Sequence, residues 1–147
     1  PRAVEFIVAR AQVDINRGAN ATALRRLEAA LTETPASYAL NITYAETALA
    51  LGEPVAAMQS LQNFLAFRGD EPRIYQLMAR AAGDQDKRAQ GHAYMAEYYY
   101  RTGDIKAAIL QLEIALKRPE LNFYETSKLE SRLTQFKAER DEEEEKR

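Results

Sequence analysis

Cysteine and histidine, which often act as nucleophiles, bases or metal ligands, are almost absent from this sequence of 147 residues. It contains no cysteine and a single histidine, His92. Thiol catalysis, disulfide bonds and cysteine-bound zinc are therefore excluded for this chain. The same holds for every metal motif that needs two histidines, including His-Glu-x-x-His. A serine nucleophile would have only His92 as its base, and no spacing in the sequence brings a serine to it. We predict that the chain is not an enzyme.

The most distinctive stretch runs from Gly91 through His92 and Glu97 to three consecutive tyrosines that end at Tyr100. His92 and Glu97 are five residues apart, which on a helix places them on different faces, so they do not form a metal-binding pair. We interpret His92 as a structural residue at an interface between helices. The three tyrosines cover most of a helix circumference, so this helix should contact neighbours on two sides. At least one hydroxyl should then reach solvent or a binding groove.

The composition excludes several further classes of protein. Hydrophobic residues make up 46% of the chain, which is too much for a disordered protein. No apolar run approaches the roughly 18 residues of a membrane span, so we expect no direct membrane insertion. The net charge of −2 argues against a nucleic-acid partner. The glycines are scattered and form no phosphate-binding loop, and we expect no cofactor in this chain.

Apolar residues recur at helical spacing along almost the whole sequence, and glycine or proline interrupts them at short intervals. No segment shows the alternation expected of a strand. The sequence therefore predicts an all-α fold. The eight expected helices cover residues 3–17, 20–33, 36–51, 54–67, 72–83, 86–102, 105–117 and 122–140.

Several of these boundaries are predicted from capping chemistry. Pro35 and Pro54 suit the first turn of a helix, where the missing N–H has no intrahelical partner. Asp104 is a candidate N-cap for the helix that follows it. Asn122, followed three residues later by Glu125, is typical of a capping box.

A four-residue pattern repeats along the chain. A small residue in one helix is followed by a glycine turn, a second small residue and then a leucine. Small residues let two antiparallel helices approach closely, and glycine permits the left-handed turn between them. The second copy lies one period after the first, and the third lies one and a half periods after the second, so helix 72–83 is interpreted as an inserted half period. The three copies are Ala11-Gly18-Ala23-Leu27, Ala45-Gly52-Ala57-Leu61 and Ala96-Gly103-Ala108-Leu112.

This pattern resembles the tetratricopeptide repeat, a helix–turn–helix unit of about 34 residues, which is the spacing from Gly18 to Gly52. The resemblance implies a right-handed superhelix of about eight antiparallel helices. An irregular helical bundle with accidental periodicity is the alternative. We expect one repeat domain over residues 1–140, followed by an acidic, frayed tail over residues 141–147. The expected core comprises Ile7, Ala11, Ala23, Leu27, Ala45, Ala57, Leu61, Leu77, Ala96, Ala108 and Leu112.

In a repeat superhelix the first helix of each pair lines a concave groove, where a protein or peptide ligand binds. The helical periodicity assigns nine residues to this groove, and we expect them to contact the ligand. They are Gln12, Asn16, Glu46, Leu49, Gln76, Arg80, Glu97, Tyr100 and Arg101.

A narrower resemblance rests on residues 74–81, on residues 92–103, on residues 107–116 and on the pair Phe123-Tyr124. These segments resemble the C-terminal repeat region of BepA-like periplasmic zinc metallopeptidases, the beta-barrel assembly-enhancing proteases. The resemblance implies a periplasmic location and a zinc site in a protease domain outside this chain. It also implies that the repeat domain contacts its own protease domain and gates it. The implied ligands are unfolded outer-membrane proteins or their assembly machinery.

The sequence leaves one alternative to this function open. The chain starts without methionine, which we interpret as a fragment boundary. The alternative to a protease accessory domain is a free-standing repeat scaffold or assembly factor with no protease attached. A zinc motif encoded before this chain would favour the first, and a signal or lipid-attachment sequence alone would favour the second.

Overall fold

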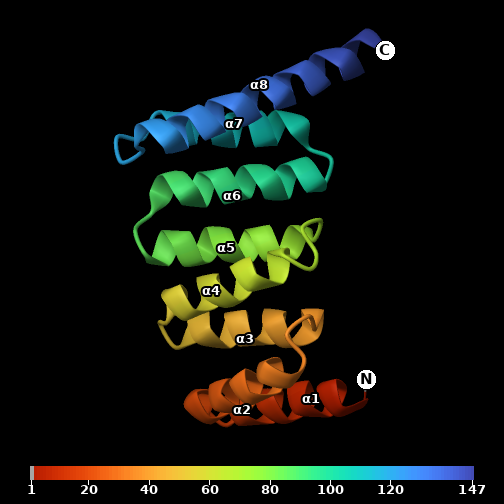
Figure 1. Cartoon of the computed structure of the whole chain (residues 1–147), viewed down its shortest axis with the longest axis vertical. Helices are drawn as coiled ribbons and strands as arrows, with labels where there is room; N and C mark the ends of the chain where they lie inside the picture. Colours follow the sequence, from red (N-terminus) through yellow and green to blue (C-terminus); the bar gives the residue numbers. More distant parts are fainter. Residues whose placement is uncertain (1) are drawn as a thin grey trace. The chain divides into compact units, whose positions relative to one another are not determined.

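The computed structural model describes the chain from residue 2 to residue 147 and its side chains from residue 3. This part of the chain consists of eight α-helices and contains no strand, which confirms the predicted all-α fold (Figure 1). The helices are α1 (Arg2–Asn16), α2 (Asn20–Glu33), α3 (Tyr38–Ala50), α4 (Pro54–Leu65), α5 (Pro72–Asp84), α6 (Arg88–Arg101), α7 (Ile105–Leu116) and α8 (Phe123–Glu145).

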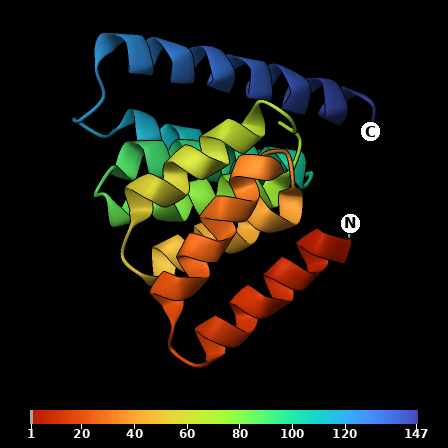
Figure 2. The same cartoon turned by 60° about the horizontal axis from the view of Figure 1, so that its bottom comes forward.

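The helices form two compact units, Pro1–Asp70 and Glu71–Arg147. In the first unit α1 packs on α2 and α3 packs on α4, while α2 and α1 both contact α3. The helices α1 and α2 are joined by a short turn and run in opposite directions (Figures 1 and 2). In the second unit α6 packs between α5 and α7, and α8 covers α7. The single superhelix expected from the repeat pattern stays a prediction.

Four inter-helix turns share one backbone geometry, with a left-handed residue after the helix. Gly18, Gly52 and Gly103 have φ of 79°, 73° and 87°. Asp86 also has a positive φ, 59°, and lies as far after Gly52 as Gly52 lies after Gly18. In each turn the residue after the left-handed one donates its N–H to the carbonyl five residues earlier, which is the Schellman motif. These bonds are Ala19 to Asp14 (2.7 Å), Glu53 to Ala48 (2.8 Å), Lys87 to Ala82 (2.9 Å) and Asp104 to Tyr99 (2.9 Å).

The turn at Asp86 corrects our interpretation of helix 72–83 as an inserted half period. The regular spacing continues from Gly52 to Asp86, so α5 and α6 form a regular third pair. The extra half period lies instead between Asp86 and Gly103. The helix there, α6, pairs with both α5 and α7. Aspartate tolerates the left-handed region better than most residues, which explains how this turn forms without glycine.

Replacing Gly52 with alanine should lower the free energy of unfolding by about 1–2 kcal/mol, because alanine is strained at a positive φ. A Cβ atom at Gly52 would meet nothing within 4 Å, so the backbone alone causes the loss. The matched control is Gly83→Ala inside α5, where the space is also open. There alanine should stabilise the helix by about 0.5–1 kcal/mol. Urea unfolding of both variants checks this, and shifts of the same sign would contradict it.

Most of the predicted helix caps are confirmed. Pro54 lies in the first turn of α4, and the side chain of Asp104 accepts a hydrogen bond from the N–H of Ala107 (3.1 Å). Asn122 and Glu125 form the complete capping box at the start of α8.

The prediction for Pro35 was wrong. The helix begins three residues later at Tyr38, because the hydroxyl of Ser37 accepts the N–H of Leu40 (3.2 Å) and caps it there. The end of the last helix was also placed too early. The acidic segment 141–145 continues α8, because it holds no glycine or proline and glutamate is a good helix former.

The predicted core is confirmed with one exception. Ten of its eleven residues are at most 2% exposed. Ile7 is only half-buried, because α1 is the first helix described and is covered on fewer sides than α3.

Candidate functional site

The predicted groove residues of the first unit lie on α1 and α3. Gln12 and Asn16 are exposed and one helical turn apart, and the amide Nε2 of Gln12 donates to Oδ1 of Asn16 (3.1 Å). Glu46 is also exposed. Leu49 is 4% exposed and belongs to the core, so a ligand could not contact its side chain. Helical periodicity alone assigned Leu49 to the groove. The structure buries it, because α3 packs against other helices on more than one side.

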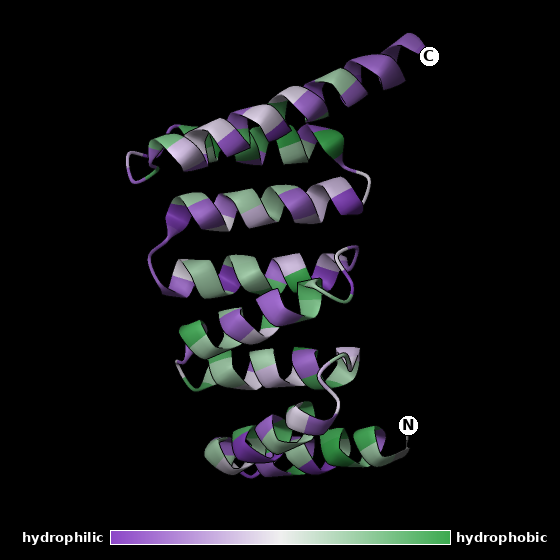
Figure 3. Cartoon of the chain, in the orientation of Figure 1, coloured by the Kyte–Doolittle hydropathy of each residue, from purple (hydrophilic) through white to green (hydrophobic). Residues whose placement is uncertain are grey.

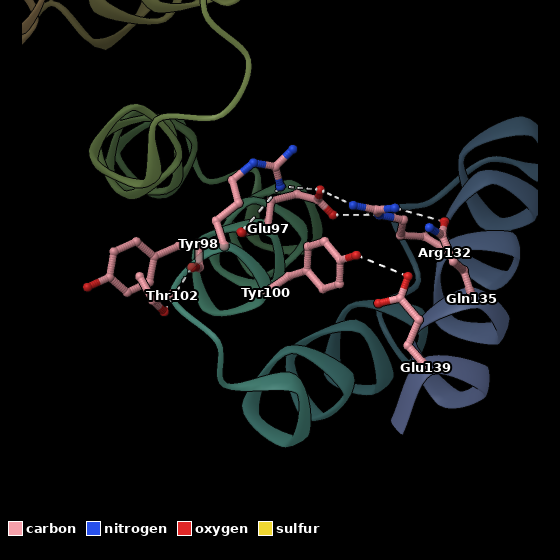
Figure 4. A network of polar contacts seen from close by, with 8 residues as sticks. Glu97, Tyr98, Tyr100, Thr102, Arg132, Gln135 and Glu139 are labelled. Atoms are coloured by element: carbon pink, nitrogen blue, oxygen red, sulfur yellow. Dashed lines mark hydrogen bonds and ion pairs between the residues drawn. The ribbon is translucent and has the colours of Figure 1, made fainter. Parts of the chain in front are cut away.

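The second unit carries the other five predicted residues, on α5 and α6. Arg80 is exposed, and Gln76 is half-buried and accepts a hydrogen bond from Nη1 of Arg73 (2.6 Å). The other three, Glu97, Tyr100 and Arg101, share one polar network, and Glu97 and Tyr100 are labelled in Figure 4. Whether these positions contact a ligand stays a prediction.

Glu97 is the centre of that network. Arg132 of α8 binds its carboxylate through two atoms, with Nε donating to Oε2 (2.9 Å) and Nη2 to Oε1 (2.8 Å). Arg101, one turn along α6, donates through Nη1 to the same Oε1 (2.7 Å). Nη1 of Arg132 also donates to Oε1 of Gln135 (2.8 Å). Since the side chains of Glu97 and Arg132 are only 19% and 27% exposed, this ion pair is largely shielded from water.

Aromatic rings support both arginines. The Tyr100 ring stacks on Phe136 with 4.5 Å between centroids and 12° between planes. The guanidinium carbon of Arg132 lies 4.5 Å from the Phe136 centroid and 4.9 Å from that of Tyr100. The guanidinium carbon of Arg101 lies 4.2 Å from the centroid of the Tyr75 ring. Such cation–π contacts hold a guanidinium in one orientation. The network therefore joins α5, α6 and α8 into one rigid surface.

The electrostatics of the network favour its charged form. Burial alone would raise the pKa of Glu97, but hydrogen bonds from Arg132 and Arg101, together with their charges, outweigh it and lower the pKa. The hydrogen bond with Glu97 raises the pKa of Arg132. The pKa of Tyr100 is raised as well, chiefly because its hydroxyl donates to Oε1 of Glu139 (3.0 Å). These shifts in pKa keep Glu97 and Arg132 charged and Tyr100 neutral at neutral pH.

The stability of the second unit should decrease in acid because of Glu97. Its pKa in the folded state lies below the ordinary value of 4.5, so the carboxylate contributes its full stabilisation above that value. The contribution is lost as the pH falls through the lowered pKa. Urea unfolding between about pH 6 and about pH 3 should show a smaller loss for Glu97→Gln than for the wild type. Equal losses in the two proteins would contradict this.

His92 is confirmed as a residue between helices. Its Nδ1 lies 2.8 Å from Oε1 of Gln111, which joins α6 to α7. Within residues 2–147, no three His, Cys, Asp or Glu side chains gather into a set that could hold a metal ion. In the second unit the candidate site therefore consists of a rigid, ion-paired scaffold on α5, α6 and α8, together with exposed Arg80 of α5. Such an arrangement can bind another molecule.

The sequence analysis missed three members of the network, Arg132, Gln135 and Glu139. All three lie on α8, and Arg132 is 35 residues from Glu97. They follow each other at helical spacing on the side of α8 that holds Phe136. This spacing beside an aromatic residue was the only indication in the sequence.

Two comparisons with known proteins support the class of protein that this fold indicates. The sequence profile of the family described as "Tetratricopeptide repeat" matches residues 15–81. The matched segment runs from the end of α1 into α5, and over these residues the chain is similar to tetratricopeptide repeats.

The chain is also similar to the beta-barrel assembly-enhancing protease of Yersinia pestis. The two are 25% identical over 137 residues, which are 93% of this chain and 28% of that protein. This match confirms the narrower resemblance seen in the sequence and extends it to nearly the whole chain. The chain spans under a third of the length of this relative. Among the described helices, none has the length and apolar character needed to cross a membrane.

Proposed function

We propose that this chain is the non-catalytic, protein-binding repeat domain of a zinc-dependent periplasmic protease of the beta-barrel assembly-enhancing type. The observation that carries this proposal is the similarity to such a protease along 93% of the chain. The domain would recognise unfolded outer-membrane proteins or their assembly machinery. It would also pack on its own protease domain and gate it. The zinc ion would be bound by that protease domain, since this chain has a single histidine and no cysteine.

The exposed side chains suit the binding of unfolded protein. Gln12 and Asn16 carry amides, each of which can donate and accept hydrogen bonds. An unfolded chain exposes its backbone N–H and C=O groups, and amide side chains can pair with both. Exposed Arg80 of the second unit would add an attraction for acidic segments. Tetratricopeptide repeats are protein-interaction modules, which agrees with this use of the surface.

The test is a binding titration with a fluorescently labelled outer-membrane β-barrel protein, unfolded in urea and diluted into the assay. The double variant Gln12→Ala, Asn16→Ala should bind about tenfold more weakly, because two hydrogen-bonding groups are lost. Alanine suits an exposed helix, so the fold should be preserved. The matched control is Gln59→Ala, Asn63→Ala, which removes the same pair at the same spacing from exposed positions of α4.

The control pair lies on the second helix of its repeat, outside the predicted groove, and should leave the affinity unchanged within about twofold. Equal losses in both variants, or no loss in either, would contradict the proposed surface. Equal affinity for an unfolded soluble protein would contradict the proposed preference for outer-membrane proteins.

A further inference from the structure

One face of α1 is apolar and open. Phe6 is 68% exposed and Val13 is 42% exposed, and Arg10 lies between them on the same side of the helix. The spacing of these three residues is one turn each, so they form a single stripe, defined here as the outer face of α1. Figure 3 shows that the N-terminal half of α1 is rich in hydrophobic residues. A groove between α1 and α2, lined by Phe6, Arg10, Ala29, Ala30 and Glu33, runs beside this face.

The equivalent face of α3, in the next repeat, is buried. A shift by one repeat period places Phe6 on Leu40, Arg10 on Tyr44 and Val13 on Thr47. These three residues of α3 are only 0%, 8% and 3% exposed.

The preceding helix, α2, covers this face of α3. The hydroxyl of Tyr44 donates to Oε1 of Glu28 on α2 (3.2 Å), and α2 packs along α3. The stripe on α3 thus faces the second helix of the preceding pair. On α1 the equivalent stripe stays exposed at Phe6 and Val13, although α2 borders it at the groove that Phe6 and Arg10 line.

The opposite face of α1 is already occupied. Ala11 is fully buried, like its equivalent Ala45, and α1 packs on α2 as α3 packs on α4. Among the described helices, α1 thus lacks the contact that α3 makes with the helix before it. The exposure of Phe6 and Val13 therefore follows from the position of α1 in the repeat.

The helix α8 offers a comparison with α1, since no described helix packs on its outer side. A terminal helix needs a polar outer side, because no further repeat covers it. Beyond its first turn, where Phe123 and Tyr124 are exposed, α8 carries mostly polar side chains at its exposed positions, including Lys128, Ser131 and Gln135. The helix is hydrophilic along most of its length (Figure 3). The outer face of α1, in contrast, carries Phe6 and Val13 at exposed positions. It has the character of an interface.

We propose that the outer face of α1 is the docking site for a further α-helix of the same polypeptide, preceding α1 and packed on it as α2 packs on α3. That helix places apolar residues on Phe6 and Val13. It places a carboxylate near Arg10, where α2 places Glu28 near Tyr44. The relative, of which this chain covers 28%, is long enough to supply such a helix. The proposal holds for a protease domain and for a scaffold alike.

Site-specific cross-linking in the complete encoded polypeptide tests this. A photoreactive amino acid at position 6 should cross-link within the same chain to a helical segment just before residue 1, mapped by mass spectrometry. The same amino acid at Glu5, about 100° away around the helix, should not reach that segment. A cross-link from position 6 to a second copy or to another protein would overturn the proposal. So would the lack of any cross-link, or an encoded polypeptide with no helical segment at that place.

Thermal unfolding provides an independent readout. In the complete polypeptide Phe6→Ser should lower the melting temperature of the repeat region by about 10 °C, because a buried aromatic ring is lost. In the chain of 147 residues the same change should shift it by at most about 2 °C, because the ring is exposed there. Equal shifts in the two proteins would overturn the proposal. None of these outcomes bears on whether a protease domain is present.

Discussion

Replacing Phe136 with alanine is expected to lower the free energy of unfolding of the second unit by about 3–5 kcal/mol. Phe136 is the only buried residue of α8, and it packs with Ala96, Ala108, Ile109 and Leu112 of α6 and α7. Alanine would leave a cavity there and would also remove the ring that stacks on Tyr100. Because α8 has no other buried anchor, it should loosen before the rest of the unit.

Urea unfolding and amide hydrogen exchange measure the two consequences of Phe136→Ala. The unfolding midpoint should fall, and the amides of α8 should exchange faster than those of α5. Phe123→Ala is the matched control, since Phe123 starts the same helix but is 88% exposed. It should change the stability by less than about 0.5 kcal/mol. If the two variants are equally stable, Phe136 does not anchor α8.

Replacing Glu97 with alanine is expected to lower the stability of the second unit by about 3 kcal/mol. The change leaves Arg132 and Arg101 without their shared carboxylate in a largely shielded place. Both guanidinium groups would lose charge-assisted hydrogen bonds that water replaces only in part. The loss should be larger than for Glu97→Gln, whose amide oxygen can still accept one hydrogen bond from an arginine.

A double-mutant cycle with Arg132→Met isolates the pair, and its coupling energy should be about 1–3 kcal/mol. The matched control is Glu113 with Lys137, which also joins a helix to α8. Their charged atoms are 4.0 Å apart, and the side chains of Lys137 and Glu113 are 43% and 46% exposed. A solvated pair of this kind should couple by less than about 0.5 kcal/mol. Equal coupling energies for the two pairs would contradict the central role of Glu97.

Much of the fold could be predicted because it depends on local chemistry. Apolar periodicity and the turn residues predicted eight helices, and residues 20–33 match α2 without correction. The errors arise where two local rules compete. Ser37 rather than Pro35 starts α3, because a capping hydroxyl decided the boundary. The turn at Asp86 was missed because glycine was taken as the mark of a left-handed residue.

The candidate site could be predicted only in part. Glu97 and Tyr100 were selected from the pattern of α6 alone, but their partners on α8 are 35 and 39 residues away. Contacts over such distances depend on how helices pack, and no local pattern in a single sequence encodes them. Leu49 shows the same limit, because burial from a second side decides whether a residue reaches a groove.

The most direct test of the proposed function is to determine the complete reading frame that encodes this chain. Our proposal predicts a signal peptide and a His-Glu-x-x-His motif on the N-terminal side of the repeats, which would make the chain the recognition domain of a zinc protease. A complete reading frame without any zinc motif would contradict the protease assignment. The chain would then be a repeat scaffold, and its partners would have to account for its exposed surfaces.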